Sequence, residues 1–438
     1  TSWSTAKTVT VSGVNDFVVD GDIGYTIVTS NAASTDTNYS GMAVNDVTAT
    51  NTDNDTAGVT VTPTTGLATN EGGLQDTFTI VLTSEPTSDV TIGLSSNDTT
   101  EGAVNPSSVT FTYVNWSAAK TVAVTGVNDF VVDGDIAYTI VTADAVSADA
   151  NYSGAVVDDV TATNSDNDTA GITVTPTSGL VTSEAGGTAQ FTIVLTSEPT
   201  ASVTIGISSS NTSEGTVDPT SVVFSGTNWS AVRTVTVTGE DDFVIDGSVA
   251  YTIQTANAAS TDTDYSGMPV ADVTATNDDN DAAGITVNPT SGLITTEGSG
   301  TAQFSVVLNT KPTASVTIDL TSSDTGEGTV SPASVTFTAV SWDSPKTVTV
   351  TGADDHVDDG DVLYTIQTAN AVSTDTNYSG LEADDVSVTN TDNDTAGVTV
   401  TPTTGLATDE AGTQDTFTVV LTSEPTASVT IGLSSDTG

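Results

Sequence analysis

The sequence predicts an all-β fold in which antiparallel β-sandwich domains follow one another in a rod. Three observations lead to this prediction. The 438-residue chain repeats itself every 113 residues, a period that is marked by Trp3, Trp116, Trp229 and Trp342. Apolar residues alternate with Thr over short stretches, and helical periodicity of useful length is absent. Turn-forming Gly, Pro, Asn and Asp residues separate these stretches.

A fixed long period indicates one folded unit copied in tandem, and a unit of this length can bury its own core. We therefore expect three complete repeats at residues 58–170, 171–283 and 284–396. Residues 1–57 form the C-terminal part of a repeat, and residues 397–438 form the N-terminal part of another. The interpretation that we favour is a window from a longer array. In the alternative, the two part-repeats complete each other between molecules, as in donor-strand polymers.

The repeat at residues 171–283 shows the expected strands in chain order: 172–175, 190–196, 203–207, 222–224, 233–238, 251–255 and 273–276. Phe191, Ile193 and Leu195 fall on one face of the second strand, while Thr residues keep the other face polar without losing β propensity. Seven or so short strands with one buried face favour an antiparallel, Ig-like sandwich. Such a repeat spans about 40 Å, and four would make a rod of about 150 Å.

The charge balance excludes several classes of partner. The chain has 57 acidic and 5 basic residues, with a net charge of −52. Nucleic acid and anionic membrane surfaces are excluded because so few basic residues could neutralise phosphates. Neutralisation must come from bound cations, salt or a basic partner. The absence of cysteine rules out a disulfide framework and leaves the compartment open, whereas abundant Thr and Ser with scarce Lys favour an extracellular or cell-surface protein. We see no signal-like segment and no apolar run near 18 residues, so we expect no membrane span.

The acids gather in four loop phases of the repeat. The loop after the first strand carries Glu71, Glu184, Glu297 and Glu410. The turn after the third strand carries Glu101, Glu214 and Glu327. A long turn carries Asp16, Asp20, Asp22, Asp129, Asp133, Asp135, Asp242, Asp246, Asp355, Asp359 and Asp361. The Asp-Asn-Asp seam between repeats carries Asp53, Asp55, Asp166, Asp168, Asp279, Asp281, Asp392 and Asp394.

Alternate loops of an antiparallel sandwich lie at the same end, so we expect these four phases to converge. Converging carboxylates repel one another by about 4 kcal/mol per pair at an effective dielectric constant of 20. A hard divalent cation removes that cost, and a preference for six to eight oxygen ligands favours Ca²⁺ over Mg²⁺. The spacing is not that of an EF-hand. The alternative is that the acids only solvate turns and block edge pairing.

Several of these residues resemble the Calx-beta domain, the calcium-binding sandwich of sodium–calcium exchangers that also occurs in tandem in bacterial surface proteins. The matching features are Glu184 with Ala-Gly-Gly and the strand 190–196, the turn from Asp241-Asp242 to Asp246, and the ending Asp279-Asn-Asp281-Ala-Ala-Gly. The resemblance implies calcium ligands at Glu184, Asp242, Asp246, Asp279 and Asp281, and at the same phases elsewhere. Two departures exist, since the turn at Glu214 is reshaped and Ser248 replaces the carboxylate of Asp135 and Asp361. We expect fewer or weaker ions at the Ser248 joint.

The sequence offers no constellation for catalysis, and we expect a protein that is not an enzyme. A recurring nucleophile–base pair and a Gly-rich phosphate loop are both missing. His356, which stands where other copies have Phe17, Phe130 and Phe243, is interpreted as a substituted packing residue. Trp229 and Tyr251, with their equivalents, are interpreted as core aromatics, the Tyr with a bonded hydroxyl.

The predicted function is a structural extracellular array: the calcium-rigidified stalk or body of a surface filament or adhesin. Its expected partners are further copies in a filament, or the continuation of a longer repeat chain. One alternative is an adhesive module whose loops or Trp residues bind a glycan or protein target. A second is a generic acidic surface, of the kind found in halophiles, without specific sites.

Overall fold

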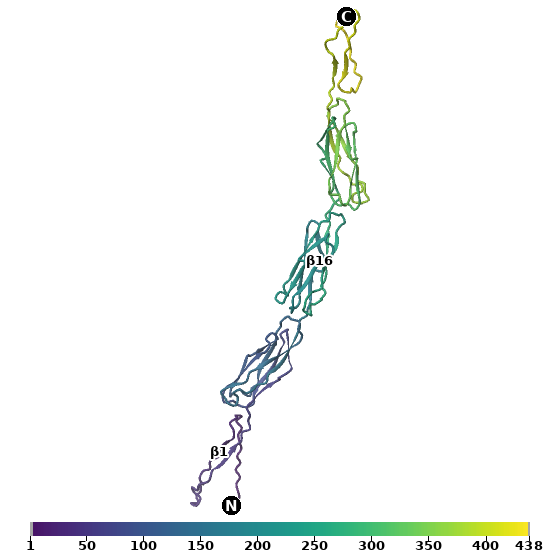
Figure 1. Ribbon diagram of the computed structural model, residues 1–438. Coiled ribbons are helices and arrows are strands. Elements are labelled where there is room, and N and C mark those ends of the chain that lie inside the picture. The colour runs from purple at the N-terminus through teal and green to yellow at the C-terminus, as the bar shows by residue number, and fades with distance from the viewer. Residues whose placement is uncertain (1–2, 437–438) are drawn as a thin grey trace.

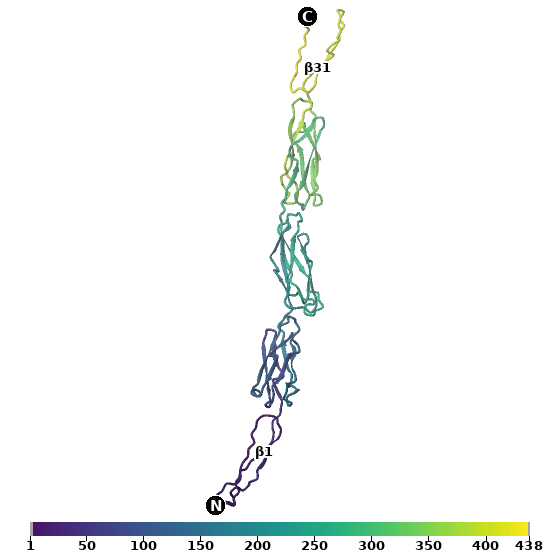
Figure 2. The same ribbon diagram turned by 90° about the vertical axis from the view of Figure 1, so that its left-hand side faces the viewer.

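The computed structural model describes residues 3–436, so the segment bounds at residues 1 and 438 lie outside the described residues. Three complete sandwiches follow one another end to end in a gently curved rod, with a partial segment at each end (Figures 1 and 2). Strands are the regular elements of this part of the chain, which contains no helix. Accordingly, no helix among residues 3–436 could cross a membrane. The fold is therefore all-β, as the sequence predicts.

The repeat at residues 171–283 consists of two packed sheets. One sheet has the order β13-β15-β19-β17 and the other has the order β14-β21-β20-β16-β18. The strands are β13 (Ile172–Thr175), β14 (Leu180–Ser183), β15 (Thr188–Leu195), β16 (Val203–Ser209), β17 (Gly215–Asp218), β18 (Ser221–Phe224), β19 (Arg233–Gly239), β20 (Val249–Thr255) and β21 (Val273–Asp278).

The neighbouring repeats have the same two-sheet architecture. The repeat at 58–170 contains β3 (Val59–Thr62), β4 (Leu67–Asn70), β5 (Gln75–Leu82), β6 (Val90–Ser96), β7 (Gly102–Asn105), β8 (Ser108–Phe111), β9 (Lys120–Gly126), β10 (Ile136–Thr142), β11 (Val146–Ser147) and β12 (Val160–Ser165). Of these, β11 is one extra two-residue edge strand, paired with β6. The repeat at 284–396 contains β22 (Ile285–Asn288), β23 (Leu293–Thr296), β24 (Thr301–Leu308), β25 (Val316–Ser322), β26 (Gly328–Ser331), β27 (Ser334–Phe337), β28 (Lys346–Gly352), β29 (Val362–Thr368) and β30 (Val386–Thr391).

The partial segments each hold one antiparallel pair. In the N-terminal segment β1 (Ile23–Ile27) pairs with β2 (Val47–Asn51), and in the C-terminal segment β31 (Val398–Thr401) pairs with β32 (Thr418–Leu421). Tyr25, which the sequence assigns to a core, is only half-buried here.

Two strands of the repeat were not expected from the sequence. The segments β14 and β17 are four residues long and lie among Gly, Ser and Pro residues, so they show too little alternation to be recognised. The strand β14 also makes its sheet mixed instead of purely antiparallel. It pairs in parallel with β21, with Leu180 opposite Ala275, whereas the other pairs of the repeat are antiparallel. The sandwich is therefore mixed at one edge.

Each complete repeat has its own core. Phe191, Ile193 and Leu195 on β15 are all buried, which confirms the predicted alternation. They pack with residues of the same repeat from the opposite sheet, such as Ile253 and Val273. Separate clusters of the same composition fill the repeats on either side. Burial of this apolar surface is the main stabilising contribution, and it is made within each repeat.

The aromatic predictions are confirmed for the complete repeats, with one correction. Tyr251 is 5% exposed and its hydroxyl lies 3.1 Å from Thr182 Oγ1. Trp229 is partly buried against its core. The packing role expected for His356 is wrong in the described chain, because its side chain is 69% exposed and its Nδ1 lies 3.0 Å from Asp354. His356 lies in the loop between β28 and β29, where its imidazole pairs with a neighbouring carboxylate and not with apolar residues.

Replacing Phe191 with Ala is expected to lower the unfolding free energy of its repeat by about 3–5 kcal/mol, because a buried aromatic ring is lost. Hydrogen exchange read by peptide should show weaker protection across residues 171–283 and unchanged protection in 58–170. The half-exposed Val223→Ala is the control, with an expected change of about 0.5 kcal/mol or less. Equal loss of protection in every repeat would show that the cores are not separate.

Candidate cation site

The four acidic loop phases meet at the C-terminal end of each complete repeat. In the repeat at 171–283, Glu184 follows β14, Glu214 precedes β17, the Asp242–Asp246 loop follows β19, and the seam acids follow β21. Two groups of carboxylates result, and within each group one oxygen per residue lies within 4.8 Å of the others. The first group is Glu184, Asp279 and Asp281, and the second is Glu214, Asp242 and Asp246.

The repeat at 58–170 has the same two groups in the same positions. They are Glu71, Asp166 and Asp168, and Glu101, Asp129 and Asp133. The structure therefore brings together residues from four separate loops, twice, with the same residue at each phase.

Main-chain amides hold the carboxylates in place. The amide of Asn280 donates to Glu184 Oε2 at 3.0 Å, and the amide of Asp281 donates to Asp279 Oδ1 at 2.7 Å. Asp279 Oδ2 accepts from Gly247 across to the long turn at 2.8 Å. Within that turn, the Asp242 carboxylate accepts from the amide of Val244 at 2.9 Å. Asp and Asn favour such turns because their side chains bond to the backbone two residues on.

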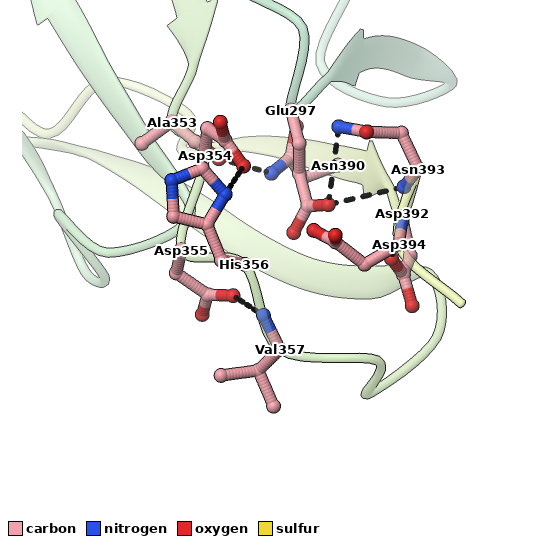
Figure 3. A network of polar contacts seen from close by, with 10 residues as sticks. All are labelled: Glu297, Ala353, Asp354, Asp355, His356, Val357, Asn390, Asp392, Asn393 and Asp394. Carbon is pink, nitrogen blue, oxygen red and sulfur yellow. Dashed lines mark hydrogen bonds and ion pairs between the residues drawn. The ribbon is translucent and has the colours of Figure 1, made fainter. Parts of the chain in front are cut away.

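The third complete repeat shows the arrangement closely (Figure 3). Glu297 Oε2 accepts from the amide of Asn393 at 3.0 Å, and Asp394 lies beside it. The carboxylates of Asp392, Asp355 and Asp394 all raise the pKa of Glu297, after burial as the larger cause. Glu327 accepts from Asn390 Nδ2 at 3.3 Å, and its pKa is raised by burial and by Asp359 and Asp355. The two groups of this repeat thus share the loop at Asp355.

The glutamates of these groups are buried although they have no basic partner. Glu184 is 5% exposed, Glu214 is 4% exposed and Glu297 is 2% exposed. The only ion pair between side chains of residues 3–436 joins His356 to Asp354, outside these buried glutamates. A buried carboxylate without a positive partner is costly, and it either takes up a proton or binds a metal ion.

One seam carboxylate oxygen in each complete repeat, in the group that contains the glutamate after the second strand, also lacks a partner. Asp168 Oδ2, Asp281 Oδ2 and Asp394 Oδ2 are buried and accept no hydrogen bond. Most buried polar atoms in proteins are satisfied, so the same orphan atom in three repeats indicates a missing ligand. The donors of both groups are carboxylate oxygens, a set that fits Ca²⁺ rather than a metal that prefers thiolate or imidazole. The residues present therefore fit a calcium ion.

The electrostatics of the site reflect this crowding. Burial, followed by the charges of Asp279, Asp281 and Asp242, raises the pKa of Glu184 to about 7. Burial, with the neighbouring Asp168 and Asp166, likewise raises the pKa of Glu71 to about 7. Burial also opposes ionisation of Asp279, but hydrogen bonds from the amides of Asp281 and Gly247 outweigh it and lower its pKa.

Some predicted site residues lie outside the two groups. Asp22, Asp135 and Asp361 accept hydrogen bonds from the seam amides of Asp53, Asp166 and Asp392, at 3.0, 3.3 and 3.3 Å. They fix the seam turn. At the equivalent position Ser248 Oγ donates to Asp278 Oδ1 at 2.9 Å, so this turn is fixed differently.

The partial segments hold incomplete versions of the site. In the N-terminal segment, burial and the charges of Asp53, Asp16 and Asp20 raise the pKa of Asp55, so these four acids lie together. In the C-terminal segment Glu410 is exposed, and the described residues after 397 include neither the long acidic turn nor a seam.

The sequence reasoning missed an Asn that positions the second glutamate. Asn277 is 1% exposed at the end of β21, and its Nδ2 donates to Glu214 Oε2 at 3.4 Å and to the carbonyl of Glu240 at 2.9 Å. Its Oδ1 accepts from Thr182 Oγ1 at 2.9 Å. Asn164 and Asn390 do the same for Glu101 and Glu327. The available signal was an Asn recurring on the apolar face of the last strand.

Comparisons with known proteins add little to this geometry. No protein-family model matches the chain, and no curated protein matches it. Among solved structures it is similar to CBD12 from CALX1.2, with 12% identity over 50% of this chain and 98% of that chain, at a TM-score of 0.25. It is similar to the S-layer protein SbsC domains 4 and 5, with 18% identity over 43% and 75% of the two chains, at a TM-score of 0.21.

TM-scores this low carry no argument about function. The β-sandwich repeat is established by the strands themselves, and the Calx-beta resemblance stays a prediction.

Without divalent cations, the chain is expected to become less stable as the pH rises from about 5 to 8. The pKa of Glu71 and Glu184 is about 7 in the fold against an ordinary value of 4.5, so the folded chain binds more protons than the unfolded chain between these values. Stability from these groups is complete below about 4.5 and is lost as the pH passes about 7. Urea midpoints in chelator measure this, and a midpoint that rises over the same range contradicts it.

Proposed function

We propose that the chain is a non-enzymatic, extracellular structural array whose repeats bind Ca²⁺ at their ends. In this role it forms the stalk or repeating body of a surface filament or adhesin. The observation that carries the proposal is the two carboxylate groups at the end of each complete repeat, each of which contains a buried glutamate with no basic partner.

The chemistry of the site supports Ca²⁺ as the ion. Glu184, Asp279 and Asp281 would hold one ion, and Glu214, Asp242 and Asp246 would hold a second. After burial as the larger cause, the negative charges of Asp242 and Asp279 raise the pKa of both Glu184 and Glu214, so the two groups lie in one negative electrostatic field. A field of this strength favours divalent over monovalent cations. Bound Ca²⁺ would supply positive charge and oxygen coordination, which removes the repulsion between the loops.

Burial argues against a generic acidic surface. Acids that serve only solubility lie in solvent, whereas Glu184 and Glu214 are nearly inaccessible and are held by amide and Asn donors. The repeat positions also argue against glycan stacking by the Trp residues. Trp116, Trp229 and Trp342 each pack against a core and against a Phe of the preceding repeat.

The end-to-end arrangement of the repeats in a rod supports a role in holding other parts of a surface structure at a distance. The acidic ends lie at the junctions between consecutive sandwiches, and the loops that carry the acids also contact the next repeat. An ion that orders these loops would stiffen the junction. Adhesion and filament assembly are the finer part of the proposal, because a stiff array of identical units is suited to both.

Glu184→Gln is expected to remove about one bound Ca²⁺ per chain, because one carboxylate charge of the first group is lost. The amide of Asn280 can still donate to the Gln carbonyl, so the fold should persist. Titration calorimetry measures the stoichiometry. Asp264→Asn is the matched control, since it removes one exposed charge and gives the residue that stands at 38, 151 and 377. The proposed calcium site would be wrong if Glu184→Gln bound as many Ca²⁺ ions as the parent, or if the parent showed no saturable Ca²⁺ binding.

Chelation is expected to shorten and soften the rod. Small-angle X-ray scattering in millimolar Ca²⁺ should give a maximum dimension near the sum of the stacked repeats. In excess chelator the same chain should show a smaller mean dimension, because repelling carboxylates loosen the loops at each junction. Identical scattering in the two buffers would mean that the ions do not stiffen the array. Circular dichroism in parallel would show whether the sandwiches themselves stay folded.

A further inference from the structure

The long acidic turns of the N-terminal segment and of the first two complete repeats each make an aromatic contact with the next repeat. The Phe130 ring lies 5.7 Å from the Trp229 ring at an interplanar angle of 43°. Phe17 and Trp116 lie 5.9 Å apart at 44°, and Phe243 and Trp342 lie 5.6 Å apart at 43°. The same tilted contact thus recurs at three consecutive junctions, which is a preferred geometry for aromatic pairs.

A main-chain hydrogen bond accompanies each aromatic contact. The carbonyl of Phe130 accepts from the amide of Glu198 at 2.7 Å, and the carbonyl of Phe243 accepts from the amide of Lys311 at 2.8 Å. At the last junction the carbonyl of His356 accepts from Glu424 at 2.6 Å. Because the following repeat takes part only through its main-chain amide, which donates the hydrogen bond, Lys311 can replace Glu without changing the bond. The Phe position therefore fixes both a ring and a backbone contact.

The backbone at this position has an unfavourable conformation for an aromatic residue. Phe17, Phe130 and Phe243 have φ values of 66°, 68° and 61°, in the left-handed region that favours glycine. Glycine would adopt this backbone conformation at a lower energetic cost if the loop made contacts only within its own repeat. A bulky ring that is kept in this region at each of three junctions indicates that the ring itself has a role.

The same turn also provides ligand residues of the candidate cation site. Phe130 lies between Asp129 and Asp133 in the chain, and Asp129 Oδ1 accepts from the amide of Val131 at 2.9 Å. Gly134, four residues after Phe130, donates its amide to the seam residue Asp166 at 2.9 Å. The carboxylates and the ring are therefore separated by only a few bonds within one hydrogen-bonded turn. Phe243 is placed in the same way by Asp242 and Asp246.

We propose that this Phe–Trp contact, here called the aromatic clasp, sets the orientation between neighbouring repeats, and that the cation site acts on the junction through it. The partner of each Phe is the Trp surface of the next repeat in the same chain. The acidic groups themselves consist of residues from one repeat. The ion therefore orders the turn, and the ring and the carbonyl of the turn hold the next repeat. The dependence on the ion rests on the proposed function, whereas the clasp itself does not.

The test is the spread of distances between spin labels on either side of the Phe243–Trp342 junction. The chain has no cysteine, so Val223→Cys and Val372→Cys introduce two unique labelling sites on exposed positions of the full chain. Phe243→Gly removes the ring and also relieves the φ of 61°, so its repeat should be no less stable than the parent. Phe243→Tyr keeps the ring. Ser299→Gly is the matched control, because it relieves a φ of 68° at a site outside this junction.

In Ca²⁺, Phe243→Gly is expected to broaden the distance distribution by about twofold or more, because the ring contact that limits rotation is gone. Phe243→Tyr and Ser299→Gly should keep the narrow parent distribution. The number of Ca²⁺ ions bound by Phe243→Gly should be unchanged in calorimetry, because its carboxylate ligands are all retained. A narrow distribution for Phe243→Gly in Ca²⁺ would overturn the clasp, since the linker and the ion would then be sufficient.

Failure of the calcium proposal gives a different result. If the parent takes up no Ca²⁺, the clasp is supported when Phe243→Gly still broadens the distribution in ion-free buffer, and it is overturned when the distribution does not change. If the parent binds Ca²⁺ but its distribution is equally narrow in chelator, the link between ion and clasp is wrong.

Discussion

The repulsion among carboxylates at the end of each sandwich is the constraint on which the rest of the structure depends. Glu184, Glu214 and their equivalents are buried with no basic side chain to neutralise them. The apolar core is large enough to hold a sandwich together, so it tolerates this cost at one end. Amide donors, a buried Asn and orphan Asp oxygens then define a place where a divalent cation would relieve the cost.

The topology explains why this constraint acts between repeats. The loops that carry the acids lie where one sandwich meets the next, and one of them also presents a Phe to the following Trp. The seam acids belong wholly to the repeat that they end, rather than bridging two repeats. A candidate ion site and a contact between domains thus share one short turn. This arrangement lets the same chemistry be repeated at every junction of a chain with a fixed period.

Much of the fold could be predicted from the sequence, because alternation such as that of Phe191, Ile193 and Leu195 depends only on neighbours along one strand. The parallel pairing of β14 with β21 could not, since it joins residues about 95 positions apart and leaves no local pattern. The recurring acids indicated the loops whose carboxylates the structure brings together. Asn277 was missed because it ends an ordinary β pattern, and the role of Phe130 was missed because its partner, Trp229, lies in another repeat.

A crystal structure of this chain grown in Ca²⁺ tests the central claim most directly. The account predicts spherical density in both groups of each complete repeat, with oxygens of Glu184, Asp279 and Asp281 at about 2.3–2.6 Å from the first ion. The orphan oxygen of Asp281 should be one of these ligands. Density for water alone, with the carboxylates turned apart or protonated at neutral pH, would contradict it.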